Sequence, residues 1–297
     1  MKIFNKLFCF LLASLFNLSF ILASVPELEV TFLDVGQGDA IFLKMPNGKT
    51  MLIDAGGIPA WKESSYDPGA AVILPFLIKN KVKRLDCVIA THADGDHIGG
   101  MSAVLDKIPT SIVYENSLES EQPEYRTLHQ TMKRKNIAGC LLRQGMTINL
   151  DPSVKIDVLS PPKDFLFENE NNNSIVLRLV HREVSFLFTG DSEYEAEENI
   201  MKHYGDKIES IILKVGHHGS STSTSDEFLG LVAPECAVIS VGKYNNFGHP
   251  YSGILAKLSD AGIETFRTDR HGDVTIYTDG DTFFVKPERE PFSKKKK

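Results

Sequence analysis

Short apolar runs alternate with longer amphipathic segments along this chain, a pattern typical of an α/β fold. Apolar or alternating runs predict strands near residues 28–34, 40–45, 50–54, 85–90, 147–150, 154–159, 175–180, 183–188, 210–215, 237–241 and, as a closing set, within 264–285. Helical periodicity predicts helices near residues 70–80, 98–106, 124–136, 193–204, 225–231 and 251–261. The elements fall into two halves without an internal repeat or a linker.

The first 24 residues differ in composition from the rest of the chain. Lys2 and Lys6 precede an uncharged apolar stretch over residues 7–23, and the small residues Ala23 and Ser24 close it. This order is that of a secretory signal peptide, whereas the length of the stretch also suits an uncleaved N-terminal anchor. We therefore expect an exported chain, either periplasmic or secreted, or a membrane-anchored chain that faces outward. Association with the inner membrane through the N-terminus is the expected membrane contact, and no protein partner is implied.

The composition of the chain after residue 24 limits its possible domain organisation and substrates. Residues 25–287 are long and apolar enough to form one domain, and residues 288–297, with four terminal lysines, predict a disordered basic tail. The formal charge is −7, and loss of residues 1–24 with their two lysines would take it to −9. Such a charge argues against general electrostatic adhesion to nucleic acid, but bound divalent cations would offset part of it. Cys87 and Cys236 lie in apolar runs, where cysteine usually behaves as a small hydrophobic residue.

The segment with the most potential metal ligands follows the strand expected at residues 85–90. Four potential metal ligands, His92, Asp94, Asp96 and His97, occur within six residues, and Gly99-Gly100 follows them. Imidazole and carboxylate groups suit zinc, manganese and iron. A cluster of this kind at the end of a strand, where a helix can begin, predicts a cation site.

The His-x-Asp-x-Asp-His-x-Gly-Gly segment resembles the metal-binding signature of the metallo-β-lactamase superfamily, in its ComEC-like branch. Asp94 is typical of that branch, since most of the superfamily has histidine there. Further segments match the branch in order: Phe32-Leu33-Asp34-Val35-Gly36-Gln37-Gly38-Asp39-Ala40, Leu52-Ile53-Asp54-Ala55-Gly56-Gly57, Asn172-Asn173-Ser174, Phe188-Thr189-Gly190-Asp191, Gly216-His217-His218-Gly219-Ser220 and Gly248-His249-Pro250. The resemblance implies an αββα sandwich: two mixed sheets face to face, helices outside and metals at one edge.

The resemblance also implies two divalent metal ions, Zn or Mn, and a ligand set. The first motif supplies part of this set, Asp191 would bridge the ions, and one of three later histidines would take the remaining place. The candidate ligands are His92, Asp94, Asp96, His97, Asp191, His217, His218 and His249. The sequence does not decide whether this ligand comes from the loop with His217 and His218 or from the loop with His249. We expect Asp96 and His218 to take part in catalysis, and Lys214 and Ser220 to contact substrate.

The implied activity is metal-dependent hydrolysis. Our first interpretation is a phosphodiesterase or nuclease that attacks single-stranded DNA with a metal-bound hydroxide. Residues Lys79, Lys81, Lys83 and Arg84 are the candidate basic patch for that substrate. One alternative is an exported hydrolase of a small molecule, such as a lactone, a β-lactam or a cyclic phosphodiester. Another is a metal-dependent DNA-binding module without turnover. No later segment could cross a membrane, so we expect no DNA transport by this chain alone.

Overall fold

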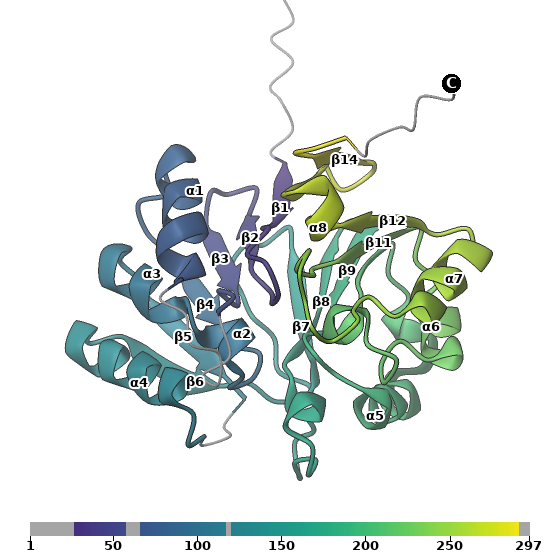
Figure 1. The fold of residues 1–297 in the computed structure, drawn as a ribbon, viewed down its shortest axis with the longest axis horizontal. Coiled ribbons are helices and arrows are strands. Elements are labelled where there is room, and N and C mark those ends of the chain that lie inside the picture. Colours follow the sequence, from purple (N-terminus) through teal and green to yellow (C-terminus); the bar gives the residue numbers. More distant parts are fainter. Residues whose placement is uncertain (1–26, 58–65, 117–119, 291–297) are drawn as a thin grey trace, which may run out of the picture.

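The computed structural model describes residues 27–57, 66–116 and 120–290 (Figure 1). The predicted signal peptide or anchor, and residues 291–297 of the predicted tail, lie outside these ranges. Within the described ranges, no helix is long and apolar enough to cross a bilayer. Glu288 and Arg289 differ from the predicted tail, because their backbone N–H groups donate to the carbonyl oxygens of Asp273 and His271.

The first sheet has eight strands in the order β14-β13-β1-β2-β3-β4-β5-β6. Their bounds are β1 Leu28–Phe32, β2 Ile41–Lys44, β3 Thr50–Ile53, β4 Cys87–Ile89, β5 Ile112–Glu115, β6 Ala138–Leu141, β13 Val274–Thr278 and β14 Phe283–Pro287. Pairing is antiparallel from β14 to β3 and parallel from β3 to β6. Strand β4 is buried along its whole length, as expected of a parallel strand covered on both faces.

The second sheet has six strands in the order β12-β11-β10-β9-β8-β7. Their bounds are β7 Lys155–Ser160, β8 Val176–His181, β9 Val184–Phe188, β10 Ile212–Lys214, β11 Cys236–Ile239 and β12 Glu264–Arg267. Strands β9 to β12 run parallel, and the β8–β9 hairpin and β7 pair antiparallel. Both sheets are therefore mixed.

Helices cover the outer face of each sheet, so the layers are αββα (Figure 1). The first sheet is covered by a π-helical turn at Gly69–Ile73, α1 Leu74–Lys79, α3 Met101–Lys107 and α4 Pro123–Lys135. The second is covered by α5 Tyr194–Tyr204, α6 Asp226–Val232 and α7 Ser252–Asp260. Short helices α2 Gly95–Ile98 and α8 Thr268–His271 lie in connections. The central core contains side chains of both sheets, among them Phe32, Ile89, Phe186 and Val238.

The predicted αββα architecture is confirmed, and the differences are local. Strands β5 and β6 were not expected; β6 is an edge strand whose four residues are all exposed. The strand expected at residues 147–150 is reduced to a single bridge between Thr147 and Asp157. Cys87 and Cys236 are buried and unpaired, in agreement with their apolar surroundings.

Candidate metal centre

The candidate centre lies where the carboxyl ends of parallel strands from both sheets meet. Asp54 follows β3, and His92 to His97 run from the end of β4 into α2. Asp191 follows β9, and His217 and His218 follow β10 in a tight turn at Gly216–Gly219. Ligands of α/β proteins typically bind at this end of parallel strands. The fold thus brings together residues that are widely separated in the sequence.

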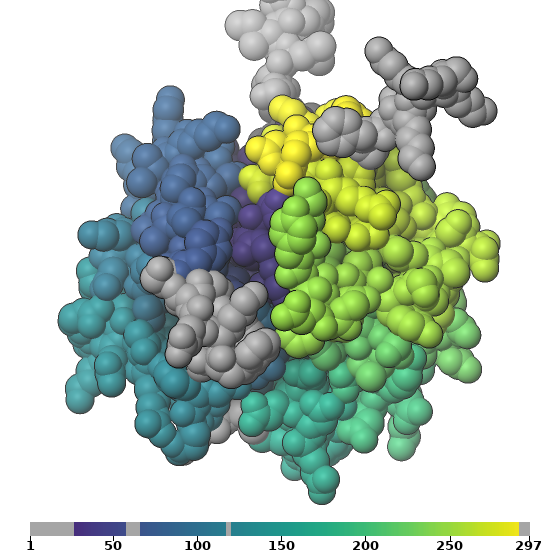
Figure 2. All heavy atoms as spheres, in the orientation of Figure 1, coloured from purple at the N-terminus to yellow at the C-terminus, as the bar shows by residue number. Residues whose placement is uncertain are grey.

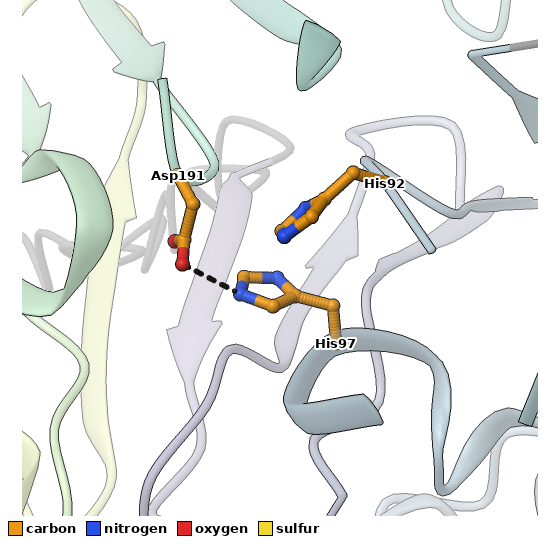
Figure 3. A group of neighbouring side chains, drawn as sticks. All are labelled: His92, His97 and Asp191. Atoms are coloured by element: carbon orange, nitrogen blue, oxygen red, sulfur yellow. Dashed lines mark ion pairs between the residues drawn. The ribbon is translucent and has the colours of Figure 1, made fainter. Parts of the chain in front are cut away.

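Asp191 is the centre of the cluster. Its Oδ2 lies 3.2 Å from His97 Nε2 and 3.3 Å from His218 Nε2, and 3.7 Å from His217 Nε2. His92 completes a group with His97 and Asp191 in which the ligand atoms all lie within 4.8 Å of one another (Figure 3). Four imidazole rings therefore gather around the Asp191 carboxylate between the two halves of the domain.

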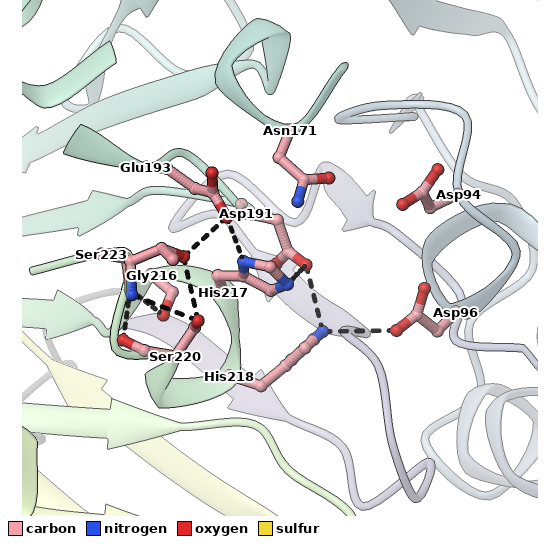
Figure 4. Close-up of polar contacts among 12 residues, drawn as sticks. Asp94, Asp96, Asn171, Asp191, Glu193, Gly216, His217, His218, Ser220 and Ser223 are labelled. Carbon is pink, nitrogen blue, oxygen red and sulfur yellow. Dashed lines mark hydrogen bonds and ion pairs between the residues drawn. The ribbon is translucent and has the colours of Figure 1, made fainter. Parts of the chain in front are cut away.

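A second group forms on the other side of His97. Ligand atoms of Asp96, His97 and His218 also lie within 4.8 Å of one another. His218 Nε2 lies 3.5 Å from Asp96 Oδ2, so this ring is placed between Asp96 and Asp191 (Figure 4). Because His97 and His218 take part in the contacts of both groups, the side chains form one continuous centre.

Each ring is held by a partner at its other nitrogen. His97 Nδ1 lies 2.7 Å from Asp54 Oδ2, and this carboxylate also accepts hydrogen bonds from the Thr91 backbone N–H (2.9 Å) and hydroxyl (2.7 Å). The same arrangement occurs at the remaining rings: His218 Nδ1 with Ser240 O (2.9 Å), His217 Nδ1 with Glu193 Oε1 (2.9 Å) and His92 Nδ1 with Thr91 Oγ1 (3.1 Å). Such partners fix the orientation of metal-binding histidines and leave Nε2 for the ion.

The turn that presents His217 and His218 has an uncommon backbone. Both residues have positive φ, 44° and 53°, a region that non-glycine residues rarely occupy. Backbone of this kind costs on the order of 1–3 kcal/mol per residue and is concentrated at functional sites. The conformation points one ring toward Glu193 and Asp191 and the next toward Asp96 (Figure 4).

The segment between β1 and β2 packs directly against α2. Asp39 N donates to Asp96 O at 3.2 Å, and Gly38 has a φ of 128°. A Cβ atom at Gly38 would lie 2.1 Å from Asp96 O, so only glycine permits this approach. The contact fixes the backbone that carries Asp96.

Charge in the centre is balanced within the protein. Burial alone would lower the pKa of His97, but the carboxylates of Asp191 and Asp54 raise it well above its usual range. The pKa of His218 rises for the corresponding reason, with Asp191 as its strongest partner. Burial would raise the pKa of Asp191, yet the two imidazoles lower it well below its ordinary value. In this state, protons on His97 and His218 and the buried Lys214 ammonium supply positive charge at the centre.

The donor set fits a divalent cation. His92 Nε2, His97 Nε2, His218 Nε2 and Asp191 Oδ1 are buried, and none makes a hydrogen bond of ordinary geometry to the described part of the chain. Burying such atoms without partners is costly unless another group satisfies them. Neutral imidazole nitrogens and carboxylate oxygens are the usual ligands of zinc and manganese. A cation here would replace the protons of His97 and His218.

An open cleft of about 410 Å³ gives access to the centre. It is lined by Gln37, Asp94, Gly95, Asp96, Gln122, Asp191, His217, His218, Phe247 and His249. Gln122 Nε2 donates to Asp94 Oδ1 at 2.8 Å, and Asp94 Oδ2 lies 3.6 Å from His92 Nε2. All residues of the first predicted motif thus reach the cluster or its cleft.

The late histidines differ in position. His217 and His218 both approach Asp191, whereas no ion pair within 4.0 Å involves His249 in the described part of the chain. His249 forms part of the cleft wall, with its ring centroid 5.4 Å from that of His217. Burial, together with His218 and His217, lowers the pKa of His249 to about 4, so its ring is neutral at neutral pH.

Lys214 and Ser220 do not contact the cleft, contrary to their predicted contact with substrate. The Lys214 side chain is fully buried, and its Nζ lies 2.5 Å from Asp39 Oδ2 and 2.8 Å from Gly190 O. Burial would raise the pKa of Asp39, but Lys214 and His218 lower it to about 2. Ser220 Oγ instead bonds the Thr222 hydroxyl within its own loop. Lys214 therefore stabilises the buried Asp39 carboxylate next to the centre.

The basic patch that was predicted to contact the substrate lies away from the metal cleft. Lys81, Lys83 and Arg84 line a separate hollow together with Lys44 and Lys49. These residues precede β3 and β4, whereas the metal ligands follow them. At about 3.3 Å per residue, the three residues of β4 span roughly 10 Å, and Arg84 and His92 each lie three residues beyond one of its ends. Phosphates at the metal cleft are therefore not contacted by this patch.

Two other histidines have structural roles outside the cluster. His181 Nδ1 lies 2.9 Å from Ser153 O. His271 is buried, and its Nδ1 accepts from Arg267 N at 2.9 Å.

Four residues of the site had no predicted role: Asp39, Asp54, Gln122 and Glu193. Asp39 precedes an apolar segment and Asp54 follows one, each in a motif that the sequence does show, and this position was the available signal. Gln122 and Glu193 lie in polar segments without a comparable signal. Their roles depend on contacts with Asp94 and His217 across the fold.

Comparison with known proteins identifies the family. A sequence profile of the Metallo-beta-lactamase superfamily matches residues 33–243. The chain belongs to this superfamily. Membership agrees with the αββα layers and with the cluster at the strand ends, and the superfamily fold implies binding of a divalent metal.

Curated relatives of this metallo-β-lactamase superfamily hydrolase have names linked to competence and recombination. The chain is 34% identical over 84% of its length to ComE operon protein 3 of Bacillus subtilis, and 33% identical over 84% to Competence protein ComA of Neisseria gonorrhoeae. It is 30% identical over 91% of its length to Recombination protein 2 of Haemophilus influenzae. The matches cover 33%, 32% and 31% of these relatives, so the chain spans about a third of their length.

Solved structures agree on the fold. Igni18, a metallo hydrolase from Ignicoccus hospitalis, aligns with a TM-score of 0.54 at 18% identity, over 84% of this chain and 98% of that one. The metallo-beta-lactamase fold protein YhfI from Bacillus subtilis aligns with a TM-score of 0.54 at 10% identity, over 87% and 100%. At these identities the likeness concerns the fold.

Proposed function

We propose that this protein is a metal-dependent phosphodiesterase that cleaves single-stranded DNA. The observation that carries the proposal is the convergence of His92, His97, His218 and Asp191 at the floor of an open cleft. The substrate class is supported by relatives named for competence and recombination, both of which are processes that act on DNA.

The reaction adds water across one phosphodiester bond. An oxygen–phosphorus bond forms, the bond to the leaving sugar oxygen breaks, and that oxygen takes up a proton. Divalent ions held here would supply an activated water and neutralise charge on the phosphate. His92, His97, His218 and Asp191 would hold them, with Asp94 and Asp96 presenting further carboxylate oxygens toward the cleft.

The protein groups around the cleft have separate tasks. Asp54 and Glu193 hold His97 and His217 in orientation through their Nδ1 atoms. His218, our predicted catalytic residue, has its nitrogens directed at Ser240 O and at Asp191 and Asp96, so we assign it to holding the ion. His249 lines the cleft with a ring that is neutral at neutral pH.

We include an exported location in this proposal, on the basis of the N-terminal sequence. Lys2, Lys6 and the apolar stretch over residues 7–23 would carry the chain across the inner membrane, after which the segment is cleaved or retained as an anchor. Cell fractionation with N-terminal sequencing tests this. The expected result is a start near Ser24 or an intact membrane-bound chain, and a full-length protein free in the cytoplasm would refute both.

The activity is tested with the purified protein, stripped of metal and reloaded with Mn²⁺ or Zn²⁺. The substrates are single-stranded DNA, bis-p-nitrophenyl phosphate, a lactone and a chromogenic β-lactam. We expect cleavage of the two phosphodiesters, no turnover of the β-lactam, and loss of cleavage in EDTA. Intact DNA alongside turnover of the lactone or β-lactam would contradict the proposal.

A hydrolase of a small molecule is the second candidate, and one observation favours it. The cleft volume of about 410 Å³ lies in the range of pockets that enclose small ligands. The same panel separates the two candidates, because only the nuclease cleaves DNA.

A further inference from the structure

The loop between β11 and α7 forms one wall of the metal cleft and is joined to the opposite sheet. Gly242 N donates to Gln37 Oε1 at 3.1 Å, and Gln37 itself lines the cleft. A Cβ atom at Gly242 would lie 2.6 Å from Gln37 N, so glycine is required for this close contact. The loop is thereby attached to the cleft at its first residue.

Asn245 holds the loop in one shape. Its Nδ2 donates to Gly242 O and His249 O, both at 2.8 Å. Its Oδ1 accepts from Phe247 N at 3.2 Å and from His249 N at 3.0 Å. The side-chain amide thus uses its two donors and both lone pairs within the loop.

This ordered loop presents aromatic rings to solvent beside the cleft. Tyr244 is 84% exposed and Phe247 is 51% exposed, although Phe247 lines the cleft. The Phe247 ring lies nearly parallel to the His249 ring, with centroids 5.7 Å apart and an angle of 26°. Lys243 Nζ lies 5.4 Å from the centre of the Tyr244 ring. Exposed apolar rings around a binding cleft typically mark a recognition surface.

In the described part of the chain, no Lys or Arg lines the metal cleft. The chain carries a formal charge of −7, and the hollow lined by Lys81, Lys83 and Arg84 lies at the opposite strand ends. Proteins that bind single strands commonly add the stacking of bases on aromatic side chains to their electrostatic contacts. Stacking requires no net positive charge, and it accepts any base because each has a π face.

We propose that loop 242–249 is a stacking platform for the unpaired nucleobase next to the scissile phosphate. Phe247 would take the base nearest the metal centre, and Tyr244 the next one outward, with Lys243 close to the intervening phosphate. In a duplex the bases are stacked on one another and paired, so the platform selects single strands. This inference rests on the proposed function, because it names how the substrate of that same cleft is held.

The first test compares the wild type with Phe247→Ala, Phe247→Trp and Phe284→Ala. Phe284 is a matched control, since it is 62% exposed and lies on β14, away from the cleft. On single-stranded DNA, Phe247→Ala should raise KM roughly 5- to 150-fold with kcat little changed. Phe247→Trp and Phe284→Ala should keep the wild-type KM. Unchanged KM in Phe247→Ala would overturn the inference.

Oligonucleotides with abasic residues around the cleavage position provide the substrate control. They keep the phosphates and lack the bases, so wild type and Phe247→Ala should have equal KM on them. If Phe247→Ala loses as much on the abasic strand as on the natural one, Phe247 acts on the cleft in general and the inference is wrong.

A binding signal separates this inference from the proposed function. A single-stranded oligonucleotide containing 2-aminopurine is titrated with the metal-loaded protein in the wild-type and Phe247→Ala forms. Fluorescence quenching that requires Phe247 supports the platform even if no DNA is cleaved, in which case only the proposed activity fails. Absence of quenching with the wild type overturns the platform, whatever the cleavage result.

Discussion

The Asp54 carboxylate lies 2.7 Å from His97 Nδ1 and thereby directs His97 Nε2 toward Asp191. Asp54 is fully buried and has a φ of 57°. Asparagine tolerates this left-handed backbone well, so Asp54→Asn removes the charge with little change in the fold. The relationship is therefore open to a clean test.

We expect Asp54→Asn to weaken metal binding about 10- to 100-fold, the usual cost of losing a group that orients a ligand. Isothermal titration calorimetry of the metal-free protein measures the affinity, and circular dichroism checks the fold. Asp260→Asn, at the exposed end of α7, is the control. Equal affinity in wild type and Asp54→Asn would show that Asp54 does not orient His97.

Lys214→Met should destabilise the protein strongly. It leaves Asp39 buried without its ion-pair partner, and breaking a buried pair in this way typically costs about 3–5 kcal/mol. Urea unfolding of the metal-free protein measures the effect, with exposed Lys44→Met as the control. Unchanged stability together with a raised KM would instead restore the substrate contact that the sequence predicts for Lys214.

The stability of the metal-free protein should depend on Glu197 in a defined direction. Burial raises the pKa of this carboxyl above its ordinary 4.5, despite hydrogen bonds from the backbone of Thr224 and Ser225. The folded state then holds a proton that the unfolded state has lost. Its contribution is fully present below pH 4.5 and is lost as the pH rises through the folded pKa.

The measurement is urea unfolding of wild type and Glu197→Gln over a pH series. The wild-type free energy of unfolding, relative to the variant, should fall with rising pH by up to about 1.4 kcal/mol per unit and then level off. A difference that stays constant or increases with pH would contradict the raised pKa.

Asp94 should shift the metal preference of the site. It adds a hard oxygen donor where most of the superfamily has histidine, and Gln122 holds it toward the cleft. We expect the metal-free protein to be at least as active with Mn²⁺ as with Zn²⁺, and Asp94→His to favour Zn²⁺. The ratio of initial rates with the two metals measures this. Strong activity with Zn²⁺ and none with Mn²⁺ in the wild type would be the opposite outcome.

The part of the site that could be predicted consists of residues that lie in short sequence motifs. His92, Asp94, Asp96 and His97 occur within six residues after an apolar strand, and Asp191 ends another. Local spacing suffices because the strand ends place these side chains together.

The parts that could not be predicted depend on long-range contacts. Lys214 ends a buried strand, and only the fold shows that Asp39 lies 2.5 Å away and makes its burial tolerable. Asn245 and Phe247 lie in a polar loop whose shape is fixed by hydrogen bonds. Hydrophobic periodicity in the sequence does not predict such bonds. Strand β6 is four residues long and includes Gly139, and its pairing with β5 is visible only in the fold.

The metal centre itself is tested most directly by measuring metal content and phosphodiester hydrolysis on the same preparations of wild type, His97→Ala and Asp191→Asn. Inductively coupled plasma mass spectrometry gives the metal content, and circular dichroism confirms folding. We predict two divalent ions per wild-type chain, and about one or fewer in both variants, with hydrolysis abolished. Folded variants that keep the wild-type metal content and full activity would contradict the account.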